Sequence, residues 1–347
     1  MKSKTVSIKN IADELKISIT TVSFVLNGKA AEKHISKEVT KKVLDYAKRI
    51  NYRPNLIAQS LRTGKSKILV FMVEDISNSF FSKLARIFED MIYEKGYKVI
   101  FCSNENNDER SRELIELFHF RQVDGFIIVP SPGIKDTIEG LIKNDIPVVL
   151  MDRFFDDLAC NYVGIDNERA SNDAVTHLID NQFKNIGFVT TTSNQSQLRD
   201  RLQGYEKAIA AHGLNPAILR IPEDKLMDGK EYISDFFNKN TDLDSVFFST
   251  NYLAQHGLET FKDNDYHLLK KLGIISFDDH DMFRLCPTSI TCVSQPLSEI
   301  SAKLIEKMLF LLDSKEENKS FKKDVLKAEL IIRESSLAKK CIENQIV

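Results

Sequence analysis

The chain has 347 residues, of which 42% are hydrophobic and 9% aromatic, and this apolar content excludes wholesale disorder. At about 150 residues per domain the length predicts two or three domains, and no apolar run approaches the roughly 20 residues of a membrane span. The N-terminus lacks the apolar stretch of a secretory signal, and the five cysteines are scattered outside any CxxC or Cys/His cluster. We therefore expect a cytoplasmic protein without a disulfide framework, a metal site or a cofactor.

Charge is distributed unevenly along the chain. Residues 1–67 contain 15 Lys+Arg and 5 Asp+Glu, a net charge of +10, whereas the remaining 280 residues carry a net charge of −12. A small basic segment joined to a larger acidic body predicts a polyanion-binding module attached to a second function. Basic charge alone is weak evidence for nucleic-acid binding, because a charged face is usually only a solvated face.

The basic segment predicts three short helices. The first has its apolar residues at i, i+3, i+4 and i+7, and Ser7 precedes it as an N-cap. After a break at residues 16–18, a second helix begins behind the candidate cap Ser18 and stops at Asn27-Gly28, a strong turn signal. A third helix is predicted from about Ser36 to Ile50. Its inward positions are expected to be Val39, Val43, Leu44 and Ala47.

This arrangement is typical of a helix-turn-helix, whose second helix enters the DNA major groove. Hydroxyl groups on that helix can contact bases or phosphates, and apolar side chains can touch thymine methyl groups. A small helical bundle without a DNA role has the same pattern and stays open as an alternative here. The exposed positions of the second helix are expected to be Ile19, Thr20, Thr21, Ser23 and Phe24.

A short segment links the basic part to the acidic body. Pro54 limits the third helix, and Gly64 ends the segment that follows it. This segment consists of the eight residues from Asn55 to Arg62 and one threonine. Eight residues are too few for a stable isolated helix, so this segment becomes helical only against a partner. A plain flexible connector is the alternative.

The acidic body alternates strand-like and helical stretches, which predicts parallel sheets covered by helices. About 280 residues suit two such lobes better than one, with ligands bound beyond the carboxyl ends of the strands. The predicted strands are 68–74, 98–102, 125–129, 147–151, 186–191, 219–221, 245–249, 273–277 and 289–293. The predicted helices are 80–95, 109–121, 134–144, 168–181, 198–212, 230–239, 253–262 and 297–314.

Several side chains just after predicted strand ends are candidates for holding a ligand. Phe80 and Phe81 can form an apolar wall or simply pack in the core, and Asp152 can contact a ligand or pair with Arg153. Asn251 can both donate and accept hydrogen bonds. The run from Asp278 to Asp281 suggests metal or acid–base chemistry, but adjacent side chains alternate in direction and rarely converge on one ion.

Motifs along nearly the whole chain, to about residue 338, resemble the LacI/GalR family of bacterial transcriptional regulators. They are Ser7-Ile-Lys-Asn-Ile-Ala-Asp, Ile17-Ser-Ile-Thr-Thr-Val-Ser-Phe-Val-Leu-Asn-Gly28, Asn51-Tyr-Arg-Pro-Asn55, Ala58-Gln-Ser-Leu-Arg-Thr-Gly64, Asp75-Ile-Ser-Asn-Ser-Phe-Phe81, Val123-Asp-Gly-Phe-Ile-Ile-Val129, Ile146-Pro-Val-Val-Leu-Met-Asp-Arg153, Arg201-Leu-Gln-Gly-Tyr205, Gly273-Ile-Ile-Ser-Phe-Asp-Asp279 and Leu330-Ile-Ile-Arg-Glu-Ser335.

The resemblance implies an α/β protein with a three-helix helix-turn-helix head (residues 1–53), a hinge helix and linker (54–67), and a body of two doubly wound parallel-sheet lobes (68–338), similar to periplasmic binding proteins, before a tail (339–347). The lobes are expected at 68–165 with 295–324, and at 166–293 with 325–338. The implied partners are a pseudo-palindromic operator DNA, a small effector of the sugar type and a second copy of the chain, with no membrane.

The resemblance also implies roles for particular residues. Leu61 is the wedge inserted into the DNA minor groove, Ala58 allows the close approach of two hinge helices, and Arg201 and Asp278 hold the effector. The residues expected at the DNA are Ser7, Ser18, Ile19, Thr20, Thr21, Ser23, Phe24, Asn27, Tyr52, Asn55, Ala58 and Leu61. The residues expected at the effector are Phe80, Phe81, Asp152, Arg201, Asn251 and Asp278.

Three departures from the family pattern affect these expectations. Lys16 stands where the family usually has a turn glycine, Phe24 stands where it often has an arginine, and Tyr252 replaces a usual aspartate. A lysine in a left-handed conformation costs roughly 1 kcal/mol. Because Phe24 cannot take a guanine bidentately, the preferred operator is expected to differ from the common one at that position.

Two alternatives from other classes are a solute-binding protein for sugar transport and a carbohydrate-active enzyme with a regulatory head. The first has no use for residues 1–67 and needs a signal peptide. The second would turn over a sugar, but the sequence contains no GxSxG and no GxxxxGK[ST] motif. The sequence therefore favours a ligand-controlled DNA-binding repressor that is not an enzyme.

Overall fold

A computed structural model describes residues 7–52, 60, 64–263, 269, 271–313 and 321–337. The chain divides into two compact units, residues 1–66 and 67–347. We call the first the head and the second the body.

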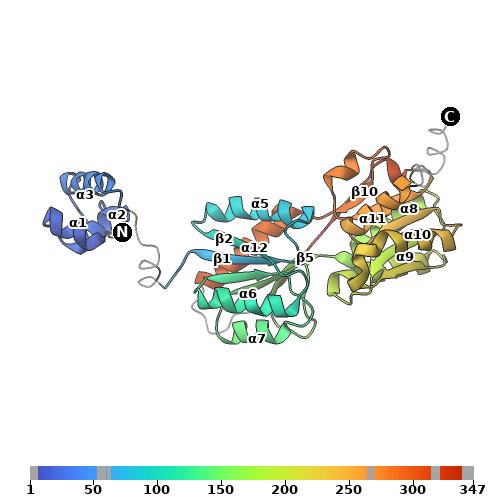
Figure 1. Cartoon of the computed structure of the whole chain (residues 1–347), viewed down its shortest axis with the longest axis horizontal. Coiled ribbons are helices and arrows are strands. Elements are labelled where there is room, and N and C mark those ends of the chain that lie inside the picture. The colour runs from blue at the N-terminus through green and yellow to red at the C-terminus, as the bar shows by residue number, and fades with distance from the viewer. Residues whose placement is uncertain are drawn as a thin grey trace. The chain divides into compact units, whose positions relative to one another are not determined.

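The described residues of the head include three helices, α1 (Ile8–Leu15), α2 (Ile19–Leu26) and α3 (Lys37–Arg49) (Figure 1). The side chains of Ser7, Ser18 and Ser36 cap them, each accepting a hydrogen bond from the first turn. Asn27 is the C-cap of α2, and the following Gly28 has a positive φ of 72°. All three helices and their predicted starts agree with the sequence pattern.

The core of the head is small and apolar. Its buried side chains come from all three helices: Ile11, Ala12, Val22, Val25, Val43 and Ala47. Leu44 was predicted to face inward, but 48% of it is exposed. Because Val43 and Ala47 already fill the face of α3 that meets α1 and α2, the residue next to Val43 on the helix turns about 100° away from them.

The turn between α1 and α2 contains a lysine in a left-handed conformation, as expected from the missing glycine. Lys16 has φ 53° and ψ 43°, a region where a Cβ atom costs roughly 1 kcal/mol. We expect Lys16→Gly to raise the free energy of unfolding of the head by about 1 kcal/mol. Hydrogen exchange of the α1 and α2 amides in the full chain measures this change. Lys16→Ala keeps the Cβ atom and is the control, so equal stabilisation by alanine would contradict the strain explanation.

Among its described residues, the body forms two six-stranded sheets, each covered by helices on both faces. The first sheet has the order β11-β5-β4-β3-β1-β2 and is parallel throughout. Its strands are β1 (Ile68–Val73), β2 (Lys98–Ser103), β3 (Gly125–Ile128), β4 (Val148–Met151), β5 (Asn161–Ile165) and β11 (Lys323–Leu326). Its helices are α5 (Ser79–Tyr93), α6 (Asp108–Phe120), α7 (Lys135–Lys143) and α12 (Leu297–Asp313).

The second sheet has the order β12-β10-β9-β8-β6-β7 and is parallel except for the edge strand β12, which pairs antiparallel with β10. Its strands are β6 (Ile186–Thr191), β7 (Ala217–Ile221), β8 (Ser245–Phe248), β9 (Gly273–Phe277), β10 (Thr291–Ser294) and β12 (Glu329–Ile331). Its helices are α8 (Asn167–Asp180), α9 (Ser196–Ala211), α10 (Gly229–Lys239) and α11 (Asn251–Asp263), with short 3-10 segments η1 (Glu223–Asp228), η2 (Asp281–Arg284) and η3 (Glu334–Ser336).

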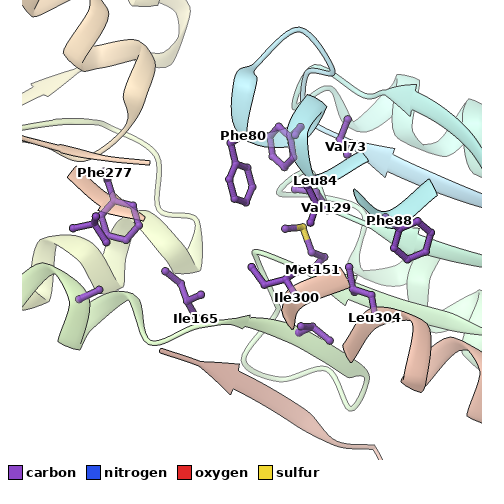
Figure 2. Packing of buried hydrophobic residues seen from close by; sticks show 14 of the residues in the cluster. Val73, Phe80, Leu84, Phe88, Val129, Met151, Ile165, Phe277, Ile300 and Leu304 are labelled. Carbon is purple, nitrogen blue, oxygen red and sulfur yellow. The ribbon is translucent and has the colours of Figure 1, made fainter. Parts of the chain in front are cut away.

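The uninterrupted apolar run of β1 explains why the first sheet is covered on both faces. Successive side chains of a strand point to opposite faces, so Leu69, Phe71 and Val73 join the core under α5 and α12. Val70 and Met72 join the core under α6 and α7 on the other face (Figure 1). Figure 2 shows part of the first core, with Met151 between Leu84 of α5 and Ile300 of α12.

The chain passes between the two sheets after β5, after β10 and between β11 and β12. The sequence did not predict β5, β11 or β12, and the expected lobe boundary at residue 324 is wrong by two residues, because β11 extends to Leu326 beside β5. We call the halves of the body the first lobe and the second lobe, after their sheets.

Candidate functional site

A pocket lies between the two lobes. All six residues that the sequence predicted at the effector line it. The wall consists of Glu74, Asn78, Phe80, Phe81, Asn106, Asp152, Arg153, Thr191, Gln195, Gln197, Leu198, Arg201, Glu223, Leu226, Thr250, Asn251, Tyr252 and Asp278.

The strand ends explain why these residues meet. Glu74 follows β1 and Asp152 follows β4 in the first sheet, while Asp278 follows β9 in the second. The carboxyl ends of parallel strands share one edge of a sheet, and the two such edges face this pocket. The site is thus assembled by the topology of both lobes.

Asp152 and Asp278 occupy equivalent positions in the two lobes, each directly after a strand. Both have a left-handed backbone, with φ 67° and 66° respectively, a conformation that Asp and Asn adopt more readily than most residues. Burial raises the pKa of Asp152 to about 6; Arg201 opposes this rise and the charge of Asp278 adds to it. Burial also raises the pKa of Asp278. Two carboxylates that are this poorly solvated favour a ligand that donates hydrogen bonds to them.

Arg201 is held in one orientation by the second lobe. Its Nε donates to Asn167 Oδ1 and a terminal nitrogen donates to the Ser249 carbonyl, both at 2.8 Å. The guanidinium carbon lies 3.6 Å from the centroid of the Phe277 ring, and a terminal nitrogen lies 4.0 Å from Asp278 Oδ2. Only 3% of this arginine is exposed.

Gly204 explains the spacing of the motif that carries Arg201. A Cβ atom at this position would collide with the backbone carbonyl oxygen of Glu168. The glycine therefore lets α9 approach α8 closely, and this approach brings Arg201 beside Asn167 at the start of α8.

Arg153 fixes the other side of the pocket. It donates hydrogen bonds to Glu74 and Asn106, and its Nε lies 3.3 Å from Asp152 Oδ2. The two roles that the sequence left open for Asp152 are therefore compatible, because this side chain pairs with Arg153 and also lines the pocket. Burial lowers the pKa of Arg153 to about 10.

Asn251 links the two lobes directly. Its Nδ2 donates to Asn78 Oδ1 at 2.9 Å, and Asn78 Nδ2 donates back to Asn251 Oδ1 at 3.2 Å. A hydrogen bond of 3.0 Å from Gln195 to Asn106 and an ion pair of 3.0 Å between Lys83 and Asp281 also join the lobes. The lobes are therefore held together by polar side chains around the pocket.

Phe80 and Phe81 combine both roles that the sequence left open. Their exposed fractions are 6% and 5%, they belong to the core under α5, and both line the pocket. Tyr252 adds a third aromatic side chain to the wall, as its departure from the family pattern suggested.

The sequence missed most of the remaining wall. The rule that ligands lie beyond strand ends would have found Glu74, Thr191 and Thr250. No local signal distinguishes Asn106, which lies in the loop after β2, or Gln195, Gln197 and Leu198, which lie at the start of α9. Gln197 is 4% exposed, and its buried Oε1 has no hydrogen-bond partner.

The acidic run after β9 does not converge on one point. Asp279 forms a bidentate pair with Arg333 at 2.8 and 3.0 Å, whereas Asp281 pairs with Lys83. Across the residues that the structure describes, no three His, Cys, Asp or Glu side chains are arranged to hold a metal ion. None of the helices in the described part of the chain is both long and apolar enough to cross a membrane.

The structure places the predicted DNA-reading residues on and around α2. Ile19, Thr20 and Asn27 are exposed, and so are the caps Ser7 and Ser18. Thr21, Ser23 and Phe24 were predicted to be exposed, but they are only partly so. Neighbouring side chains cover them: the Thr21 hydroxyl lies 2.8 Å from that of Ser18, and Asn27 donates to the Ser23 hydroxyl at 3.3 Å. The Lys33 ammonium lies 5.6 Å from the centroid of the Phe24 ring.

The other predicted DNA contacts follow α3. Tyr52 is partly buried against the core of the head. Asn55, Ala58 and Leu61 lie outside the described residues, as does the predicted tail.

Models of known protein families match both the head and the body. A family model for "Bacterial regulatory proteins, lacI family" matches residues 7–55. A model for "Periplasmic binding proteins and sugar binding domain of LacI family" matches residues 65–304. The chain is 32% identical over 335 residues to the HTH-type transcriptional regulator RegA of Clostridium saccharobutylicum, covering 95% of this chain and 99% of the relative. It is 31% identical over 300 residues to catabolite control protein A of Priestia megaterium, covering 86% and 90%.

Solved structures show the same fold. The lac repressor dimer bound to operator and the anti-inducer ONPF matches with a TM-score of 0.84 at 18% identity, covering 96% of this chain and all of that one. A LacI family transcriptional regulator from Enterococcus faecium with bound ribose matches with a TM-score of 0.67 at 23% identity, covering 78% and 99%.

A helix-turn-helix head and a two-lobed body with a polar pocket between its lobes define a ligand-responsive DNA-binding regulator. The chain belongs to the LacI family of bacterial regulatory proteins. Its relatives are transcriptional regulators rather than enzymes. The match over residues 7–55 does not favour the alternative of a solute-binding protein, which has no use for a DNA-binding head.

Proposed function

We propose that the protein is a homodimeric repressor whose operator affinity is set by a sugar or sugar derivative bound between the lobes. The observation that carries this proposal is the meeting of Asp152, Arg201 and Asp278 on one interlobe pocket. Carboxylates accept hydrogen bonds from hydroxyl groups, and the fixed fork of Arg201 donates to ligand oxygens. Phe80 and Phe81 provide an apolar surface for the carbon face of a sugar.

The proposed mechanism couples the pocket to residues 54–67, which we assign as the hinge. Effector binding changes the angle between the lobes, and the distance between the two hinge segments of a dimer changes with it. Only closely spaced segments can fold against each other on DNA. The coupling is reciprocal, because operator and effector must alter each other's affinity by the same factor.

The proposed site binds its ligand without turnover. A repressor of this kind acts in the cytoplasm on double-stranded DNA, with lysine and arginine of the head neutralising phosphates of a near-palindromic operator. Saturable sugar binding with unchanged sugar after long incubation distinguishes this role from that of a carbohydrate-active enzyme.

A panel of sugars scored by thermal unfolding tests the proposal. A sugar present at about 100 times its Kd is expected to stabilise the body by about 2.7 kcal/mol. Operator binding is then measured with and without the active sugar. A protein that holds every DNA duplex equally well, or that holds its operator equally tightly with the pocket filled and empty, contradicts the proposal.

The raised pKa of Asp152 predicts a pH dependence of effector binding. The ionised carboxylate is the form that accepts from ligand hydroxyls, and its pKa is about 6 in the free protein. We therefore expect the Kd to rise as the pH falls through 6, by about tenfold between pH 8 and pH 5. Titration calorimetry across this range measures it.

The stability of the free protein has the opposite dependence. The pKa of Asp152 is higher in the folded protein than its ordinary value of 3.8, so the folded state binds the proton more tightly. The free energy of unfolding of the free protein should therefore rise as the pH falls from above 6 towards 4.

The variant Asp152→Asn tests the pH dependence of effector binding. It removes the titrating group and tolerates the left-handed backbone, so it should flatten the pH dependence of the effector Kd. A wild-type slope in this variant would assign the titration to another group.

A further inference from the structure

The outward face of α2 carries two apolar side chains, Ile19 and Phe24, beside uncharged polar ones. Buried Val22 and Val25 fix the inner face of this helix, so Ile19, Thr20, Phe24 and Asn27 lie towards the outside. Ile19 is 46% exposed, a large exposure for an aliphatic side chain at the start of a helix. The helix contains no charged, Asn or Gln residue between Ile19 and Leu26.

Most polar groups next to this face are already bonded within the head. The Ser18 hydroxyl caps the helix by accepting from the Thr21 amide at 3.0 Å and also lies 2.8 Å from the Thr21 hydroxyl. The side-chain amide of Asn27 donates to the Ser23 carbonyl at 2.7 Å. These groups are therefore poorly placed to read the donors and acceptors of base edges, and an exposed Thr20 hydroxyl is the main polar group left on the face.

A lysine beside this face supports phosphate contact rather than base reading. The Lys33 ammonium lies 5.6 Å from the centroid of the Phe24 ring and pairs with Glu32 at 3.1 Å. A lysine on this flank can reach a phosphate, which carries no sequence information. The guanine-specific fork of an arginine is absent from α2.

The major groove offers one apolar group on its base edges, the C5-methyl group of thymine. We propose that α2 reads the operator mainly through thymine methyl groups, which Ile19 and Phe24 contact, and not through guanine edges. This inference rests on the proposed DNA-binding function and specifies its target. Ile19 and Phe24 are five residues apart, roughly 7.5 Å along the helix axis, so each contacts a different thymine of the half-site.

Removal of single methyl groups from DNA tests this inference. The operator is first selected from a random duplex library with the full-length protein. Each thymine of the selected sequence is then replaced by uracil, which lacks only the methyl group, and the Kd is measured at fixed salt. We expect a loss of about fourfold per methyl group at two positions of each half-site. Replacing the uracil–adenine pair at either position with a 5-methylcytosine–guanine pair restores the methyl group but changes the other base edges. This replacement should therefore recover less operator affinity than thymine does.

Protein variants assign each methyl group to its side chain. Ile19→Ala should abolish the uracil effect at one position and leave the other intact, and Phe24→Ala should do the reverse. If Phe24→Ala destabilises the head, Phe24→Leu keeps an apolar side chain and should preserve part of the effect. Phe24→Arg should shift the preference at its own position from thymine to guanine.

The outcomes separate this inference from the proposed function. If the selection yields no preferred sequence, the proposed repressor function itself fails. If a preferred operator emerges but no thymine responds to uracil, or the response survives both Ile19→Ala and Phe24→Ala, the reading by methyl groups is overturned. An unchanged base preference in Phe24→Arg means that this residue does not face bases.

Discussion

The variant Asp278→Ala is expected to lose the effector response while keeping basal operator binding. The Asp278 carboxylate lies in the pocket, where one oxygen accepts from Gln295 at 2.6 Å and the other lies 4.0 Å from Arg201. Two charge-assisted hydrogen bonds to ligand hydroxyls would contribute about 3 kcal/mol or more. Their loss should raise the effector Kd by roughly 100-fold or more. The measurements are calorimetric titration of the active sugar and release of a labelled operator.

Two further variants control for the backbone and for charge. Alanine at φ 66° is strained, whereas Asn tolerates this conformation, so Asp278→Asn separates loss of the carboxylate from loss of local structure. Asp235→Asn removes an exposed carboxylate of α10 outside the pocket wall and should leave the response unchanged. A normal sugar response in Asp278→Ala would remove this residue from the site.

The parts of the fold that the sequence predicted are those whose pattern is local. The apolar run of β1 and the periodic apolar faces of α5 and α12 can be recognised in the sequence, because the residues that each element buries are regularly spaced within that element. The missed strands β5, β11 and β12 lack such a pattern. The strand β11 is four residues long with Lys323 at its start, and it exists because its backbone pairs with β5, 161 residues earlier in the chain.

The same distinction applies to the site. Asp152, Arg201 and Asp278 could be predicted because strand ends and a conspicuous motif mark them. The use of Asn251 was only half foreseen: its side-chain amide was expected to face a ligand, and it bonds Asn78 of the other lobe. That contact joins residues 173 positions apart, so only the arrangement of the two lobes in space reveals it.

The contact between Asn78 and Asn251 bears on how the pocket can control DNA. Side-chain hydrogen bonds already join the two lobes around the pocket in this structure. The ligand can change the balance only through contacts that differ between open and closed forms. In the proposed site, Asp152 in the first lobe and Asp278 in the second would supply such contacts, because one sugar can touch both only when the lobes are close.

The second large effect is expected in the hinge, where Leu61→Ala should lose most of the specific operator affinity while the head and body stay folded. An apolar wedge inserted at a central base step opens the step and bends the duplex, which brings more DNA against the protein. A dimer presents two such wedges, and each loses about three carbons of buried side chain in the variant. At about 0.8 kcal/mol per carbon, the loss exceeds 4 kcal/mol per dimer, roughly 1,000-fold in operator Kd.

Measuring the affinity for nonspecific DNA separates the contribution of Leu61 from that of the phosphate contacts. Phosphate contacts supply nonspecific binding, so Leu61→Ala should leave the Kd for nonspecific DNA and its salt dependence unchanged. The Kd for the operator should rise towards the Kd for nonspecific DNA. Leu44→Ala removes the same atoms from a half-exposed leucine of α3 and is the matched control. It should bind the operator as the wild type does. If Leu61→Ala also retains wild-type operator affinity at the same salt concentration, the hinge does not insert a leucine into DNA, and the coupling between the pocket and the operator must run through the heads alone.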